Sequence, residues 1–250
     1  IEDSKILQKV TYYIIKYYDS NIEYEYYDNG EQMKKGKLAI FDTFKTKDKD
    51  LTGEAKRQRS IITILGSNVN PAERTRTGIS QKIAKKQKIT WKNIYSGIFR
   101  DLDEILLPME IAEEDGRLPL KRGPKALQEK GIPYYHLTKK GILVGLAING
   151  IDNLPSQLKE FFSDAEPEEK EFEKVLTKFI TNSPNFTYSI FQKYVKAFCE
   201  EKINELLPFN LSKLKQIPDE NLIIQKEILT AFLKLTNQEK KDATAFLEKI

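Results

Sequence analysis

The sequence predicts a mainly α fold of the α+β class, with a mixed middle part followed by an all-helical carboxy-terminal region. Apolar residues recur at three- to four-residue spacing through most of the chain, as in amphipathic helices. Two extended stretches flank a Lys-Arg-Gly-Pro-Lys turn at 121–125 and indicate a strand pair. A chain of 250 residues that is 40% hydrophobic and 31% charged is typical of a soluble globular protein.

Composition excludes several classes of site. Cys199 is the single cysteine and His136 the single histidine, so no intrachain disulfide, thiolate zinc site or histidine pair can form. No apolar run approaches the roughly 20 residues that cross a bilayer, and no secretory pattern opens the sequence. We therefore expect a cytoplasmic protein with no membrane partner, no metal and no cofactor.

The chain divides into three predicted parts. Residues 1–53 form a tyrosine-rich segment in which Val10–Tyr18 suits either a helix or a strand. A turn at Asp28–Gly30 and a short strand at Lys37–Phe44 follow. Residues 54–150 form the middle part, and residues 151–250 form a helical dimerisation or interaction domain.

Start and stop signals place the elements of the middle part. A first helix ends near Gly66, and Asn70 followed by Pro71 opens a second one that runs to about Gln87. Thr90 is expected to cap a third helix, which Pro108 stops. Strands are expected at 116–120 and 133–137, and a fourth helix begins near Thr138.

The last hundred residues carry helical apolar faces separated by prolines at 184, 208 and 218. Thr236 and Glu239 have the spacing of a capping box, which predicts a terminal helix. If these helices leave an apolar stripe after forming their own core, a two-fold homodimer would cover it. A monomeric helical region packed on the middle part is the alternative.

Charge is unevenly distributed along the chain. Residues 54–150 hold 18 basic and 10 acidic residues, whereas residues 151–250 hold 14 and 17. All seven arginines lie in the middle part: Arg57, Arg59, Arg74, Arg76, Arg100, Arg117 and Arg122. Because guanidinium groups bind phosphate and guanine edges in a bidentate manner, this concentration favours a nucleic-acid surface over an ordinary solvated basic one.

The predicted order of helix, helix, helix, strand, basic turn, strand and helix is that of a winged helix-turn-helix domain. Residues 54–150 resemble that family through three stretches: Thr77–Lys86, Thr90–Leu102, and Arg122–Lys125 with the later Tyr134–Gly141. The last stretch is similar to the passage from wing to helix in archaeal transcriptional regulators. The long turn from Lys121 to Ile132 departs from the family pattern. The resemblance implies a sequence-specific regulator that binds double-stranded DNA.

In such a domain the third helix reads the major groove through its first residues. Because Ile94, Ile98 and Leu102 point inward, helical geometry turns the polar positions outward. Asn93 suits adenine and Arg100 suits guanine. Trp91 is expected to pack at the helix start. The expected DNA-binding residues are Lys92, Asn93, Ser96 and Arg100 on this helix, Arg122 and Lys125 on the wing, and Arg74 and Arg76 in the early part of the second helical stretch.

Catalysis is disfavoured, and we expect no enzymatic activity. His136 lies in an apolar strand and is expected to be structural, and Asp101, Asp103 and Glu104 are expected to form surface ion pairs. Cys199 is expected to be a buried small hydrophobe. A winged helix that serves as a protein-interaction or assembly scaffold is the main alternative function, and an RNA-binding factor is a third.

Overall fold

The computed structural model describes two compact units, residues 1–36 and 37–250. Within them the described residues are 27–28, 31–32, 36–45, 50–67, 70–119, 131–163, 167–209, 211–218 and 220–247. In the first unit, β1 (Tyr27–Asp28) and β2 (Glu31–Gln32) pair antiparallel on either side of the predicted turn. The ambiguous stretch Val10–Tyr18 lies outside the described residues.

The predicted strand at Lys37–Phe44 is wrong. Leu38, Ala39 and Ile40 are buried without a strand partner. Instead, the Ala39 N–H donates to Gln58 Oε1 at 2.8 Å, and Arg59 Nε donates to the Ile40 carbonyl at 2.7 Å. Side chains of the following helix therefore satisfy backbone groups that a neighbouring strand would otherwise satisfy.

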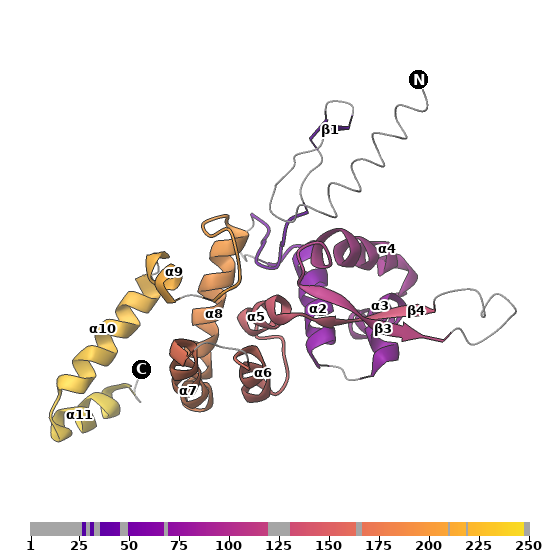
Figure 1. Ribbon diagram of the computed structural model, residues 1–250. Coiled ribbons are helices and arrows are strands. Elements are labelled where there is room, and N and C mark those ends of the chain that lie inside the picture. Colours follow the sequence, from indigo (N-terminus) through magenta and orange to yellow (C-terminus); the bar gives the residue numbers. More distant parts are fainter. Residues whose placement is uncertain are drawn as a thin grey trace, which may run out of the picture. The chain divides into compact units, whose positions relative to one another are not determined.

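The helices of the middle part form where predicted (Figure 1). They are α2 (Gly53–Ser67), the 3₁₀ turn η1 (Pro71–Arg74), α3 (Arg76–Gln87) and α4 (Lys92–Arg100), which continues as the π-helical turn η2 (Asp101–Leu106). Asn70 caps η1 by accepting from the Ala72 N–H, and Thr75 caps α3 by accepting from the Gly78 N–H. The prediction that Thr90 caps the third helix is wrong, because α4 begins after Trp91 and has no side-chain cap there.

Two antiparallel strands follow, β3 (Ala112–Leu118) and β4 (Ile132–Leu137). β3 begins four residues before the predicted strand, and its register with β4 shifts between Glu114 and Gly116. Thr75 adds a single antiparallel bridge to Tyr134, so the junction between η1 and α3 borders the sheet. Most of the predicted wing, residues 120–130, lies outside the described residues.

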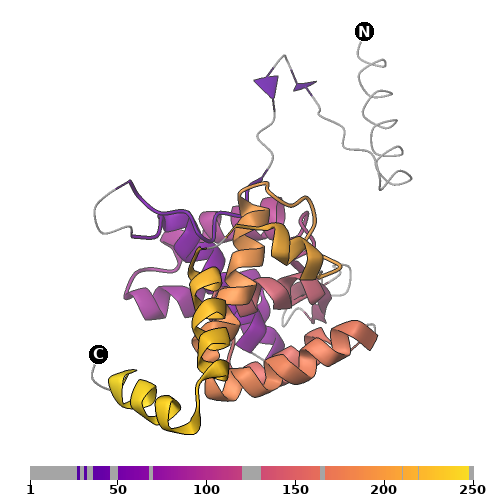
Figure 2. The same ribbon diagram turned by 90° about the vertical axis from the view of Figure 1, so that its left-hand side faces the viewer.

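The remaining described elements are helical, as predicted. They are α5 (Lys139–Ala147), α6 (Leu154–Phe161), α7 (Pro167–Asn182), α8 (Pro184–Cys199), α9 (Leu211–Gln216), α10 (Glu220–Lys234) and α11 (Asn237–Leu247). The capping box is confirmed, because Glu239 Oε2 accepts from the Thr236 N–H at 2.7 Å. Figure 2 shows α10 and α11 as two helices joined by a sharp turn. None of the helices in the described ranges has the length and hydrophobicity needed to cross a bilayer.

One hydrophobic core runs from Leu38 to Ile217. α5 is buried along almost its whole length between α2 and α8, and aromatic rings of α6, α8 and Phe209 meet edge to face or tilted beyond it. The core therefore extends across the predicted 150/151 boundary, and the middle and carboxy-terminal parts share it. The mainly α class with a small antiparallel sheet is confirmed.

Candidate nucleic-acid interface

α4 presents a polar row to solvent while its other side joins the core. Asn93, Ser96 and Arg100 are spaced so that they share one face of the helix, and all three are exposed. Ile98, on the opposite face, is completely buried. α3 packs against α4 and braces it through its own buried residues, Ile79 and Ile83. The predicted row thus lies on a supported helix.

The row borders a hollow of about 410 Å³. Its lining residues are Arg57, Asn93, Ile94, Ser96, Gly97 and Arg100. Arg57 and Gly97 were not predicted as site residues, because Arg57 comes from α2 and its approach to α4 has no local signal in the sequence. A Cβ atom at position 97 would lie 2.9 Å from Arg57 Nε, so this glycine makes room for the arginine side chain.

The charge of the hollow depends on Asp101, whose fully buried side chain pairs with the lining residue Arg57. Arg57 Nε donates to Asp101 Oδ2 at 2.8 Å, and Arg100 Nη2 lies 3.8 Å from Asp101 Oδ1. Two guanidinium groups therefore face one carboxylate and leave one positive charge in excess. Half of the Arg100 side chain is exposed, so this charge is accessible to a ligand.

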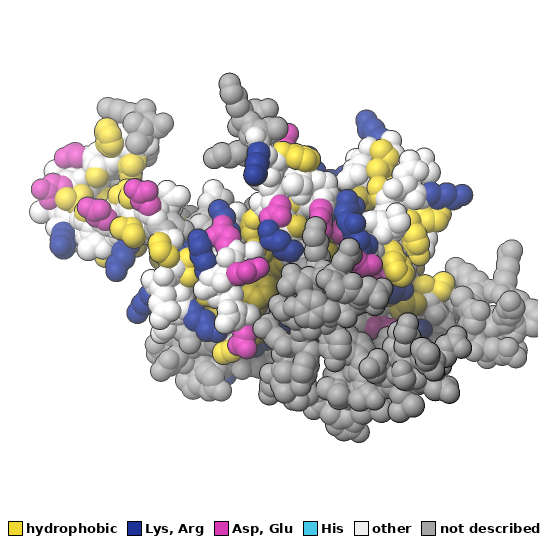
Figure 3. All heavy atoms as spheres, turned by 90° about the horizontal axis from the view of Figure 1, so that it is seen from above, with side chains coloured by type: hydrophobic (Ala, Val, Ile, Leu, Met, Phe, Trp, Pro, Cys, Tyr) yellow, Lys and Arg dark blue, Asp and Glu magenta, His cyan; other side chains and the backbone are white. Residues whose placement is uncertain are grey.

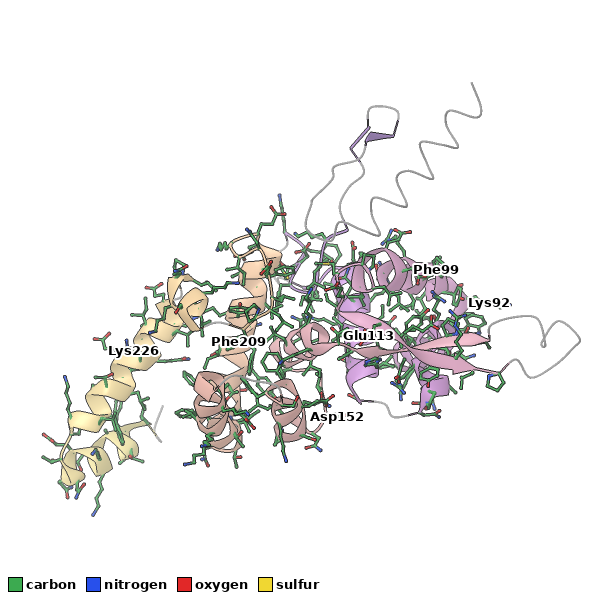
Figure 4. All side chains as sticks on the ribbon, in the orientation of Figure 1. Lys92, Phe99, Glu113, Asp152, Phe209 and Lys226 are labelled. Atoms are coloured by element: carbon green, nitrogen blue, oxygen red, sulfur yellow. The ribbon has the colours of Figure 1, made fainter. Side chains whose placement is uncertain are left out.

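Lys92 and the aromatic residues complete the α4 surface. Lys92 is exposed at the start of the helix, and Figure 4 shows it on the same helix as Phe99. Trp91 and Tyr95 are half-buried, with ring centroids 5.7 Å apart in an edge-to-face arrangement. This contact agrees with the expectation that Trp91 packs at the helix start. Seen from above, Lys and Arg side chains stand out from the part that holds α3 and α4 (Figure 3).

Arg74 and Arg76, also predicted to bind DNA, lie in ion pairs within the fold. Arg74 Nη1 contacts Asp115 Oδ2 at 2.8 Å, and only 12% of its side chain is exposed. Arg76 Nε donates to Asp103 Oδ2 at 3.0 Å, with its guanidinium over the rings of Phe99 and Tyr135. Neither guanidinium lines the α4 hollow. Arg122 and Lys125 lie outside the described residues.

Most of the arginine concentration is explained by internal bonds. Five of the six arginines in the described ranges are bound within this chain. Arg57, Arg76 and Arg117 hydrogen-bond to carboxylates, Arg59 donates to the Ile40 carbonyl, and Arg74 donates to the Tyr135 carbonyl beside its ion pair with Asp115. Arg100, with its longer contact, is the exception. The clustering of arginines is therefore weaker support for nucleic-acid binding than the sequence suggests, and the exposed residues of α4 are the stronger support.

Asp101 and Asp103 are more buried than expected, whereas Glu104 is exposed. Asp101 was expected in a surface ion pair, yet its side chain is fully buried against Arg57. The Asp103 side chain is 18% exposed beside Arg76. These pairs tie α4 and η2 to α2 and α3, so they position the exposed row instead of contributing to the outer surface.

The residues considered for catalysis form no reactive cluster. His136 Nε2 lies 3.0 Å from Glu113 Oε1, across the β3–β4 pair. Cys199 is half-buried, and burial raises the pKa of its thiol to about 12. Within the described ranges, no group of three histidine, cysteine or acidic side chains is arranged to hold a metal ion.

No family model matches this chain, and neither a curated protein nor a solved structure is found to be similar to it.

Proposed function

We propose that residues 54–150 form a winged helix-turn-helix domain and that the protein is a cytoplasmic, sequence-specific regulator that binds double-stranded DNA. The order of α2, α3, α4, β3 and β4 supports this proposal. The bridge from Thr75 to Tyr134 adds to it, because it joins the segment between the first two helices to the edge of the strand pair. In such a domain the second helix braces the third, which enters the major groove.

The observation that carries the proposal is the exposed row of Asn93, Ser96 and Arg100 beside a hollow with excess positive charge. The asparagine amide pairs with the donor and acceptor edge of adenine, and the arginine fork pairs with O6 and N7 of guanine. The serine hydroxyl serves either a base or a phosphate. Lys92, exposed beside this row, suits a phosphate contact that fixes position without reading sequence.

Two copies are expected to act together. A two-fold dimer would place two α4 helices about 34 Å apart, which corresponds to one turn of duplex and a palindromic site. No catalytic step is part of this mechanism, and regulation would follow from occupancy of the DNA site.

Selection of bound sequences from random duplex DNA, followed by fluorescence anisotropy of the full chain, tests the proposal. Arg100→Ala is expected to relax preference at particular base pairs, at a cost on the order of 1 to 3 kcal/mol. Lys92→Ala is expected to weaken binding to all sequences alike. Lys174→Ala, which removes an exposed lysine of α7, is the matched control and is expected to change neither property.

The same measurements separate the alternatives. Direct phosphate contacts require the affinity to fall steeply as salt is raised. Weak binding with no salt dependence would overturn the proposal in favour of a protein-interaction scaffold. Preferential binding of single-stranded or structured RNA would instead indicate an RNA-binding factor.

A further inference from the structure

The helices α10 and α11 expose most of their apolar side chains. In the described ranges twelve large hydrophobic residues are exposed, and seven of them lie on these two helices. Ile228 is 58% exposed and Leu233 is 70% exposed. Neither helix has a buried residue among those described. Leu222, in the first turn of α10, packs against the core, whereas the rest of the helix exposes apolar side chains over much of its circumference. Because a helix of this kind is normally buried, the exposed part of α10 calls for a partner.

Among the described residues, the body of the protein approaches the first turns of α10. A hollow of about 440 Å³ lies between α8 and the first turns of α10. Lys193 and Lys196 line it from α8, whereas Asn221 and Ile224 line it from α10. Ile224 is 47% exposed there. Ile228 and Ala231, further along the helix, do not line this hollow and are exposed, so this part of α10 is open to an external partner.

The sequence of α10 places a row of exposed apolar residues beside a row of charged residues. Ile224, Ile228 and Ala231 follow i, i+4 and i+7 spacing and form one exposed row, the α10 seam. Glu227 and Lys234 lie seven residues apart, so they occupy the same flank beside that seam. Lys226 lies on the side of the helix away from the seam.

These charges favour a second copy of this chain as the partner. The described residues of α10 and α11 carry four lysines and four acidic residues, so the pair of helices is neutral and does not repel its own copy. A membrane-binding helix would instead carry a predominantly cationic polar face. A strongly charged partner is likewise disfavoured, because α10 and α11 together carry no net charge of the opposite sign.

We infer that two copies of the chain associate through the α10 seam, with the two α10 helices antiparallel. In that arrangement the flank that carries Glu227 and Lys234 faces the same flank of α10 in the other copy. Glu227 then meets Lys234 of the second copy, and the two-fold axis repeats the contact with the roles exchanged. A parallel pair aligned in register would bring like charges to equal heights and lose both contacts. This inference deepens the two-copy arrangement of the proposed function by naming the surface that joins the copies.

Sedimentation of the full chain at micromolar concentration tests the inference, and a dimer is expected. Ile228→Glu places two charges at the centre of the seam and is expected to raise the dissociation constant by at least about 100-fold. Because Ile228 is exposed in the single chain, the variant is expected to keep its thermal unfolding midpoint. Leu233→Glu adds the same charge on the opposite side of α10, where the side chain is 70% exposed, and is expected to leave the dimer intact.

Charge exchange tests the antiparallel geometry. Glu227→Lys alone and Lys234→Glu alone are each expected to weaken the dimer by about 10-fold, because each brings two pairs of like charges together. A mixture of the two variants forms opposite-charge pairs at both sites, and its heterodimer is expected to regain wild-type affinity. Lys226→Glu is the matched control and is expected to have no effect.

A full-length monomer, or a dimer that Ile228→Glu leaves unchanged, would overturn the inference. Weak heterodimers in the mixture would overturn the antiparallel arrangement. Failure here is distinguishable from failure of the proposed function, because anisotropy reports DNA binding by α4 whether or not two copies associate. A monomer that binds duplex DNA contradicts only the interface, whereas a dimer that ignores DNA contradicts only the DNA-binding proposal.

Discussion

Arg57 and Asp101 form a partly buried ion pair between residues that are 44 positions apart in the chain, with Arg57 Nε 2.8 Å from Asp101 Oδ2. The Asp101 side chain is fully buried, and 22% of the Arg57 side chain is exposed. The pair joins α2 to the point where α4 continues into η2. It therefore sets the position of the helix that carries the exposed row Asn93, Ser96 and Arg100.

Removal of Arg57 is predicted to destabilise the fold. Arg57→Ala leaves the buried Asp101 carboxylate with only the longer contact to Arg100, so the free energy of unfolding in urea is expected to fall by about 3 kcal/mol. Asp101→Asn in the same chain is expected to restore part of this loss, because the uncompensated charge is gone. Arg117→Ala breaks an exposed pair with Glu114 and should cost less than about 1 kcal/mol. Equal losses for Arg57→Ala and Arg117→Ala would contradict this view of the buried pair.

Gly97→Ala is predicted to act through Arg57. The added Cβ would lie 2.9 Å from Arg57 Nε and displace that side chain from Asp101. Although alanine favours a helix by about 1 kcal/mol over glycine, the net effect in the native chain is expected to be destabilising. In the Arg57→Ala background the obstruction is absent, and Gly97→Ala is expected to stabilise. Urea unfolding of the four chains measures this coupling, and additive effects would exclude it.

The predicted wing should contribute to DNA affinity without reading sequence. Arg122→Ala and Lys125→Ala are each expected to reduce the slope of log affinity against log salt by about one unit, as for one lost phosphate contact. Preference among selected DNA sites should stay unchanged, in contrast to Asn93→Ala. Anisotropy at several salt concentrations, with selected and random duplexes, provides the measurement. A loss of base preference in the wing variants would place the reading surface on the wing.

Cys199 is predicted to be unreactive in the folded protein. Burial raises the pKa of its thiol from 9.0 to about 12, so almost none of it is thiolate at pH 8. Alkylation by iodoacetamide is therefore expected to be at least about 100-fold slower than for the same chain unfolded in guanidinium. Because this is the single cysteine, mass spectrometry of the intact chain follows one reaction. Rapid labelling of the native chain would contradict the raised pKa.

Tyr135 is predicted to make stability fall in alkaline solution. Its pKa is raised from 10.0 to about 12 by burial, so the unfolded chain loses this proton at a lower pH than the folded one. The stability that protonated Tyr135 contributes is complete below pH 10 and is lost as pH rises towards 12. Over that range the free energy of unfolding falls with a slope that approaches about 1.4 kcal/mol per pH unit. Tyr135→Phe is expected to remove this part of the slope. Urea unfolding of both chains from pH 9 to 12 measures this slope. An unchanged slope in Tyr135→Phe would contradict the prediction.

Local patterns determined most of the helices and several of their ends. Asn70 and Pro71, Thr138, and the pair of Thr236 and Glu239 act within one helical turn, so their roles can be read without knowing the fold. The exposed row on α4 follows equally from the inward spacing of Ile94 and Ile98. Thr90 shows the limit of such signals, because the helix begins one residue later than the pattern indicates.

The tertiary structure decided which charges remain available. The sequence shows seven arginines in one part of the chain but not that Arg74 and Arg76 face carboxylates of Asp115 and Asp103. Pairing across tens of residues depends on how helices and strands pack, and residue order does not reveal it. The same reason applies to α10, whose apolar pattern suits a core helix equally well, and only the packing left it uncovered.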